Sequence, residues 1–197
     1  MMMLKKNILL GTFFLTLQIF ILLINDNSIL TLNLFWVCNH IPLLLALSFY
    51  FNKKQAVKGL ITAGFIGQFI WALDFLSYFI ISNHLFGFTS RVMNLNEIQL
   101  LITLAAHFLG TFVALLATYK DKIKPQSLKY TYAYLLPLFF LTYLFTPISY
   151  NINCIHEICG LEAYTFSGYT LALPFLVTFI LIIPGYYFQK LLNRLDS

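Results

Sequence analysis

The sequence predicts an all-α integral membrane protein, a bundle of six transmembrane helices in a single domain over residues 1–197. Composition is the first reason, because 60% of the residues are apolar and only 10% are charged. An ordinary soluble domain has about a quarter charged residues and somewhat under half apolar ones. A water-soluble monomer is therefore excluded.

The arrangement of the apolar residues is the second reason. Crossing the hydrocarbon core takes about 20 apolar residues in a helix, since lipid cannot hydrogen-bond an open backbone. Apart from histidines, Asp74 is the only charged side chain within the apolar stretches. The predicted spans are residues 7–24, 29–51, 59–81, 98–119, 130–150 and 168–189.

The first stretch follows Lys5 and Lys6, as the apolar part of a cleaved signal peptide also would. However, Asn25–Ser28 lacks the small-x-small pattern of a cleavage site, and the apolar run is long. We therefore expect an uncleaved first span.

The basic residues indicate how the chain is oriented. Of the 12 lysines and arginines, 11 lie near the two termini or in the loops after the second and fourth spans, which share one side of the membrane if there are six spans. Only Arg91 lies on the opposite side. The positive-inside rule then places both termini in the cytoplasm and the protein in the inner, or cell, membrane. This accounts for the net charge of +5 without a nucleic-acid partner.

The lysines of the loop 120–125 are open to two interpretations. They can contact anionic lipid headgroups, or they can act only as a topology anchor. The external loops, about residues 82–97 and 151–167, are short. Any active site must therefore lie in or at the membrane.

Three helices carry rare polar side chains at matching depth. With the predicted orientation, Cys38 and His107 lie roughly 14 Å below the outer surface and Asp74 roughly 10 Å below it. An ionisable residue in a span usually has a functional or pairing role. We expect these three to line one cavity, with Trp71 and Asn151 near its rim.

Local sequence supports such a site. Pro42 cannot hydrogen-bond the carbonyl four residues back, which belongs to Cys38. Trp71 and Asp74 share a helix face with Gly67 and Tyr78, and His107 lies in a stripe of small, weakly polar residues. Each feature also has a structural explanation: a cysteine can be a small filler, and an Asp–His pair can be a buried contact.

The last external loop contains Cys154, His156, Glu157 and Cys159. The spacing is not a strong zinc pattern, and neither a metal nor a cofactor is predicted. A Cys154–Cys159 disulfide and two separate thiols are both compatible with the sequence.

The chain resembles a widespread family of uncharacterised bacterial multi-span membrane proteins over about residues 30–155. The motifs that carry the resemblance are Trp36-Val37-Cys38-Asn39, Trp71-Ala72-Leu73-Asp74, His107, Thr146-Pro147 and Asn151-Ile152-Asn153. More distantly, Cys38 with a histidine nearby and His107 two helices later resemble the eukaryotic transmembrane acyltransferase family and its bacterial YwaF-like relatives. Here an asparagine separates Cys38 from His40, and the flanking residues differ.

That second resemblance implies acyl transfer or hydrolysis of a membrane lipid, with Cys38 as the nucleophile and His107 as its base. Asp74 would orient His107, in the logic of nucleophile, base and orienter. The expected substrate-binding residues, some of which could stabilise an oxyanion, are Asn39, His40, Gln68, Trp71, Asn151 and Asn153.

Two other classes of protein fit the same residues. In a small transporter, Asp74 and His107 would relay protons or bind a cation near the midplane. In a non-catalytic accessory protein, the polar residues would only hold helices together. The oligomeric state stays open.

Overall fold

The computed structural model describes residues 2–24, 35–159 and 162–195, which contain helices and no strands. The uninterrupted long helices are α1 (Met2–Ile24), α3 (Val37–Tyr50), α4 (Lys54–Ile81) and α7 (Gln126–Phe145). Short 3₁₀ turns occupy Ser90–Asn94, Ile148–Tyr150, Ile152–Cys154 and Glu162–Tyr164. The all-α prediction is confirmed.

Two further helices each contain a π-helical segment. Helix α5 (Glu97–Leu104) continues through the π-helix Ala105–Leu109 into α6 (Gly110–Thr118). Helix α8 (Tyr169–Val177) continues through Thr178–Ile182 into α9 (Ile183–Leu195). Such segments are rare and are often found at functional sites.

The described helices suit a membrane. Four of them are long and apolar enough to cross it: Leu4–Leu23, Lys54–Ile81, Glu97–Thr118 and Tyr169–Leu195. Helix α3 has 14 residues, about 21 Å of helix where the core needs about 30 Å. Helix α7 has 20 residues, but Lys129 and several tyrosines lower its hydropathy. The predicted count of six spans is therefore not confirmed, and residues 25–34, with the expected start of the second span, lie outside the described residues.

Several helices extend past the apolar stretches. Helix α4 begins at Lys54 rather than at residue 59, α7 begins at Gln126 rather than at 130, and α9 ends at Leu195 rather than at 189. Lysine, glutamine and leucine are good helix formers. Hydropathy marks the part of a helix that suits lipid and not the end of its hydrogen bonding.

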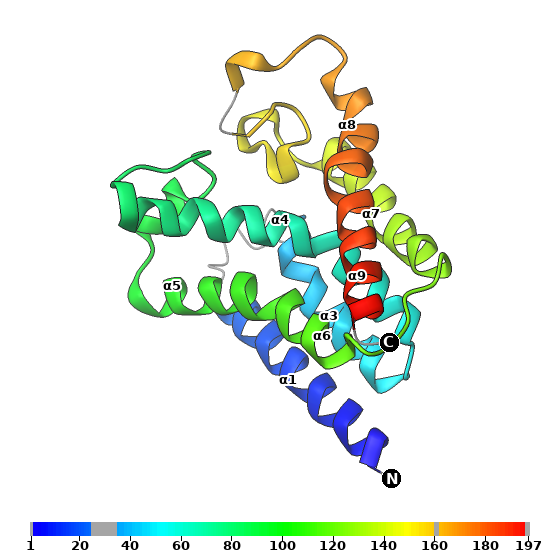
Figure 1. The fold of residues 1–197 in the computed structure, drawn as a ribbon. Helices are drawn as coiled ribbons and strands as arrows, with labels where there is room; N and C mark the ends of the chain where they lie inside the picture. The colour runs from blue at the N-terminus through cyan, green and yellow to red at the C-terminus, as the bar shows by residue number, and fades with distance from the viewer. Residues whose placement is uncertain (1, 25–34, 160–161, 196–197) are drawn as a thin grey trace.

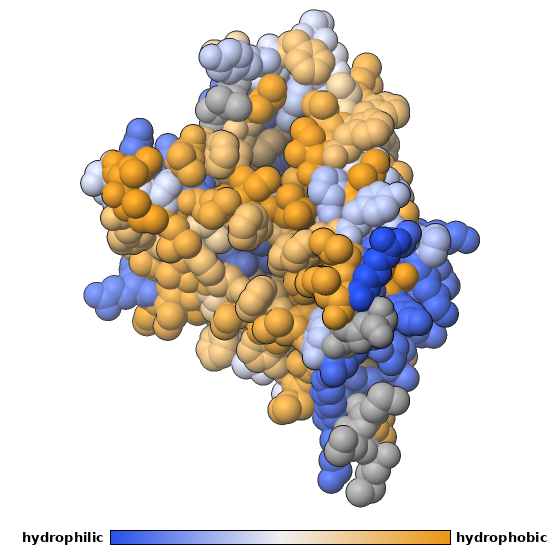
Figure 2. All heavy atoms as spheres, in the orientation of Figure 1, coloured by the Kyte–Doolittle hydropathy of each residue, from blue (hydrophilic) through white to orange (hydrophobic). Residues whose placement is uncertain are grey.

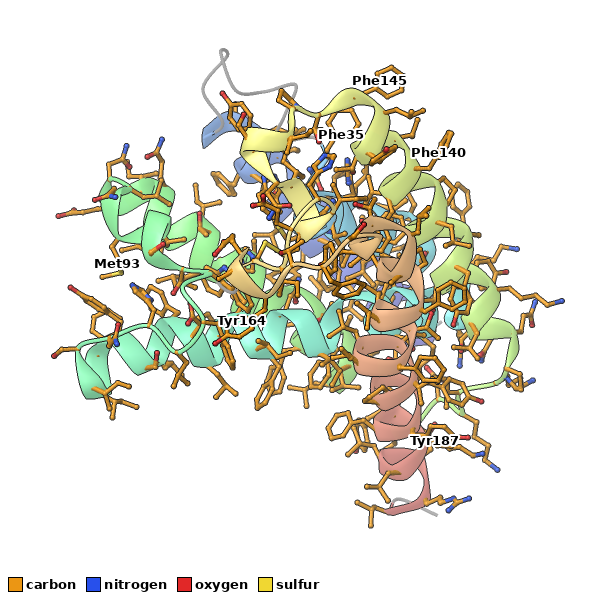
Figure 3. All side chains as sticks on the ribbon, turned by 90° about the horizontal axis from the view of Figure 1, so that it is seen from above. Phe35, Met93, Phe140, Phe145, Tyr164 and Tyr187 are labelled. Carbon is orange, nitrogen blue, oxygen red and sulfur yellow. A yellow bond between two sulfur atoms is a disulfide. The ribbon has the colours of Figure 1, made fainter. Side chains whose placement is uncertain are left out.

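The basic segments meet at one end of the molecule, here called the lysine-rich end: residues 5–7, 52–54, 119–124 and 190–194. Lys6 Nζ donates to the carbonyl of Ala117 over 2.7 Å, and Lys54 pairs with Asp121 over 2.5 Å. Asn193 donates to the carbonyls of Tyr119 and Asp121. From this end α1, α4 and α5–α6 diverge from α7 and α8–α9, so that α4 crosses the line of α8–α9 steeply (Figures 1 and 3).

Apolar side chains cover most of the face of the molecule shown in Figure 2. Leu171 is 82% exposed and Ile80 is 80% exposed. Phe140 and Phe145 point outward from α7 (Figure 3). Soluble monomers rarely expose this much apolar surface, so the exposed side chains fit a lipid environment.

Candidate functional site

Helices α3, α4 and α6 approach one another closely at Gly64. A β-carbon on Gly64 would lie 2.5 Å from Ile41 Cδ1 and 3.0 Å from Thr111 Cγ2. The missing side chain therefore lets Ile41 of α3 and Thr111 of α6 pack against the same point of α4.

The contact at Gly64 is a reference point from which the positions of three predicted site residues along their helices can be compared. Helices α3 and α6 run toward the lysine-rich end and α4 runs away from it. Three positions lie about one helical turn, or about 6 Å, farther from the lysine-rich end than this contact. They are residues 37 and 38 on α3, Gln68 on α4 and His107 on the π-helix. Counted along the helices from the Gly64 contact, Cys38, Gln68 and His107 are each about one turn away.

His107 is held on two sides. Its ring stacks on the indole of Trp71, with ring centroids 3.9 Å apart and an angle of 19° between the planes. Its Nδ1 lies 2.9 Å from the backbone oxygen of Thr103. Because a carbonyl can only accept, Nδ1 carries the proton in this pair, and Nε2 of the neutral ring offers a lone pair.

Gln68 joins α4 to the residues just after the π-helix. Its Oε1 accepts hydrogen bonds from Thr111 N over 3.2 Å and from Thr111 Oγ1 over 2.6 Å. The backbone N–H can only donate, so the amide oxygen must face Thr111. The Nε2 of Gln68 is then left buried, with no hydrogen-bond partner in the part of the chain that the structure describes.

Cys38 is a free, half-buried thiol in the first turn of α3. Its Sγ lies 3.6 Å from Oδ1 of Asn39. The Tyr134 hydroxyl donates to Val37 O over 2.9 Å, next to Cys38 in the chain. No hydrogen bond joins Cys38 to His107 within the described residues.

Asn153 fixes the start of α3. Its Oδ1 accepts from Val37 N over 3.0 Å, and its Nδ2 donates to Phe35 O over 2.5 Å. Figure 3 shows Phe35 beside the segment that follows α7. Asn153, expected to bind substrate, therefore acts here as a cap that places Cys38.

His40 and Pro42 lie in the same helix. The Nδ1 of His40 is buried and has no partner among the described residues. Beyond Pro42, Leu43 N donates to Oε1 of the buried Gln18 on α1 over 3.1 Å. Helix α3 thus uses a side chain of α1 where proline disturbs the usual bonding.

The sequence suggested that Asp74 orients His107, but in the structure Asp74 bonds elsewhere. Its fully buried carboxylate accepts four hydrogen bonds from the loop after α4. Oδ1 accepts from Phe86 N at 2.5 Å and Gly87 N at 3.1 Å, and Oδ2 accepts from Thr89 N at 2.9 Å and Thr89 Oγ1 at 2.8 Å. These donors satisfy Asp74, and Thr103 O takes the orienting place beside His107.

The histidine near Asp74 is His84. Its Nδ1 lies 2.8 Å from Thr89 Oγ1 and 3.7 Å from Asp74 Oδ2, and its ring stacks on Tyr78. Because Thr89 Oγ1 donates to Asp74, His84 Nδ1 donates to Thr89. The expected Asp–His association exists, but with a histidine of the neighbouring loop.

Asn151 organises the segment 151–159 rather than a cavity rim. Its Oδ1 accepts from His156 N and Glu157 N, each at 3.0 Å, and its Nδ2 donates to Glu157 O. Cys154 and Cys159 form a disulfide, which resolves the two possibilities left by the sequence. Across the described residues no group of three His, Cys, Asp or Glu side chains is placed to hold a metal.

Sequence reasoning missed Thr103 as the hydrogen-bond partner of His107, and it missed Tyr134 and Gln18. Thr103 lies four residues before His107, so helical spacing could have identified it. Tyr134 is one of 12 tyrosines, and nothing in its neighbours distinguishes it.

Comparison with family models, with curated proteins and with solved structures found no match to this chain.

Proposed function

We propose that this protein transfers or hydrolyses an acyl chain of a membrane lipid, with Cys38 as nucleophile and His107 as base. The observation that carries the proposal is the hydrogen bond between His107 Nδ1 and Thr103 O. It leaves Nε2 as the basic nitrogen, at the level of the only free thiol among the described residues. A thiolate formed by an adjacent imidazole is a common covalent catalyst.

The reaction would run in two balanced steps. In the first, His107 Nε2 takes the proton of Cys38 and the sulfur attacks the ester carbonyl carbon. The alcohol leaves with the proton returned by the imidazolium, and a thioester remains on Cys38. In the second, a water or an acceptor hydroxyl gives its proton to His107 and attacks the thioester, and the Cys38 sulfur leaves and regains a proton.

Gln68 supports the proposal as a donor for the oxyanion formed in each step. Its buried Nε2 has two N–H groups and no partner among the described residues, while its Oε1 is fixed by Thr111. A donor held in this way needs no reorganisation when charge develops, and removing one such donor costs roughly 100- to 1,000-fold in kcat.

Lateral access for the lipid is supported by Gly67. A β-carbon there would meet nothing within 4 Å, so space lies beside Gln68 and one turn from Trp71. Hydrophilic side chains lie recessed in the apolar face between α4 and α5–α6 (Figure 2). Trp71, Asn39 and His40 would contact the lipid, and the chemistry needs no cofactor.

The topology proposed from the lysines is six spans in the inner membrane, with both termini in the cytoplasm. The Cys154–Cys159 disulfide supports it independently. Disulfides persist in oxidising compartments, and this one lies in the segment between α7 and α8, beyond the helix ends away from the lysines. Reporter fusions after Asn52 and Asp121 should therefore report cytoplasm, and a fusion after Glu162 the exterior.

A proton-coupled transporter is less well supported. Asp74 was its one embedded acid, and that carboxylate already accepts four hydrogen bonds. A carrier that must gain and lose a proton in each cycle would break and remake this loop every time.

The proposal is tested by lipid turnover. Purified protein in nanodiscs is given phospholipids with a labelled acyl chain, and the released fatty acid and new acyl lipids are separated. We expect Cys38→Ser and His107→Ala to lose turnover by about 100-fold or more. His84→Ala is the matched control, because His84 lies at the Asp74 loop, and it should keep turnover. Equal turnover by the wild type and Cys38→Ser would remove the proposal.

A further inference from the structure

A pocket of about 280 Å³ opens at the lysine-rich end between α1, α3, α4 and the end of α6. Its charged lining consists of Lys6, Lys53, Lys54, Lys120 and a single acid, Asp121. Four lysines and one aspartate leave a net charge of +3. The pocket is far along α4 from the site of His107 and has no part in the proposed acyl transfer.

The lysines are only partly satisfied by the protein. Lys54 pairs with Asp121, and Lys6 donates one hydrogen bond to Ala117 O. The exposed Lys53 has no side-chain hydrogen bond or ion pair within the described residues. Asn7 and Asn52, hydrogen-bonded to each other over 3.1 Å, add polar groups to the lining.

The start of α4 adds to the positive potential. Helix α4 has 28 residues, and no side chain caps its first turn beside Lys53 and Lys54. The free N–H groups at the start of a helix and its dipole both favour an anion.

Helix α4 also carries a buried cation one residue beyond the last of its lining residues. Lys58 follows Val57 in sequence but is not part of the pocket lining; it is 0% exposed, and its Nζ has no hydrogen-bond partner within the described residues. Asp121, the one acid of the pocket lining, pairs with Lys54. No ion pair to Lys58 is found within the described residues, and a buried ammonium without its own counter-ion is costly.

We propose that this pocket binds a phosphate group, namely the headgroup phosphate of an anionic phospholipid. Its volume is near the lower end of ligand pockets, roughly 300–1,000 Å³, which suits a headgroup. Phe49, Val57 and Ala117 form an apolar part of the lining, along which the acyl chains can leave toward the bilayer. Basic pockets between helices at this side of a membrane are typical binding places for anionic headgroups.

Native mass spectrometry of the full chain in detergent tests the proposal. The probes are phosphatidylglycerol and phosphatidylcholine with identical acyl chains, and inorganic phosphate is tested separately by its effect on Tm. Lys6→Gln/Lys53→Gln changes two exposed residues of the pocket. Lys129→Gln/Lys190→Gln is the matched control, since both lysines lie at the same end but outside the pocket.

We expect the wild type to retain phosphatidylglycerol in preference to phosphatidylcholine. Lys6→Gln/Lys53→Gln should weaken retention about 25-fold, or about fivefold per lysine, and the control pair less than about twofold. If phosphate raises Tm only when the pocket lysines are present, and the two lipids are retained equally, the phosphate site stands and the lipid assignment is wrong. The proposal is overturned if both double variants behave alike with every probe.

Discussion

Two buried polar clusters on α4 differ in how completely they are satisfied. Asp74 and Gln68 lie six residues apart in sequence and are 0% and 7% exposed. Both carboxylate oxygens of Asp74 are occupied by donors from one loop. Gln68, and His40 on α3, instead each keep a buried nitrogen without a partner among the described residues.

This difference distinguishes a cluster that supports the fold, at Asp74, from a candidate site, at Gln68. In lipid no water is available to satisfy an open polar group, and each one costs several kcal/mol. A cluster in which every polar group has a partner, such as that of Asp74, therefore needs no ligand and acts as a structural support. A cluster with open donors and acceptors can take partners from another molecule, and at the level of His107 that molecule would be the proposed lipid substrate.

Asp74→Ala should produce the largest loss of stability. It would leave three backbone N–H groups and the Thr89 hydroxyl without their acceptor. At about 1 kcal/mol or more for each of the four unsatisfied groups, we expect a loss of about 4 kcal/mol or more, measured by thermal unfolding in detergent.

Asp121→Asn is the control for this variant, since it removes a more exposed acid from one ion pair and should cost less than about 1 kcal/mol. Equal losses for the two variants would show that the Asp74 loop is not a support.

Gln68→Leu should have a smaller effect on stability and a larger one on turnover. The variant leaves the N–H and hydroxyl of Thr111 without an acceptor, which costs about 1–3 kcal/mol, and it removes the proposed oxyanion donor. Unfolding and lipid turnover are measured on the same preparation. Thr111→Val is the control because it leaves the Nε2 of Gln68 in place. If turnover falls equally in both variants, the amide nitrogen has no role in catalysis.

His107→Ala should have the smallest effect on stability of the three. It removes one stacked ring pair with Trp71, worth about 0.5–1.5 kcal/mol beyond area burial, and one hydrogen bond to Thr103. Thermal unfolding measures this loss. A loss as large as that of Asp74→Ala would place His107 among the structural supports.

The sequence predicted the parts of the molecule that depend on local pattern. Apolar length predicted the all-α class and the long apolar helices, but the count of six spans is not confirmed. The common level of Cys38 and His107 was inferred from the rise per residue that α-helices share. The partner of Asp74 could not be predicted in this way. Its donors are mainly backbone N–H groups 12 to 15 residues away, and every residue except proline has an N–H.

Other features depend on packing between distant segments. Lys58 is buried, and its backbone oxygen accepts from Nε2 of Gln189 on α9 over 3.2 Å. Hydropathy placed Lys58 outside the membrane. The π-helix around His107 likewise has no marker in its residues, because Gln68 of another helix supplies the acceptor that Thr111 uses.

The central claim is that His107 activates Cys38, and the labelling rate of Cys38 by an electrophile with a lipid tail tests it most directly. Cys154 and Cys159 are paired, so Cys38 should account for all labelling of the unreduced protein. We expect His107→Ala to slow labelling by about 100-fold, whereas His84→Ala leaves the rate unchanged. Slow labelling that does not depend on His107 would contradict the claim, since an unactivated thiol in apolar surroundings is inert.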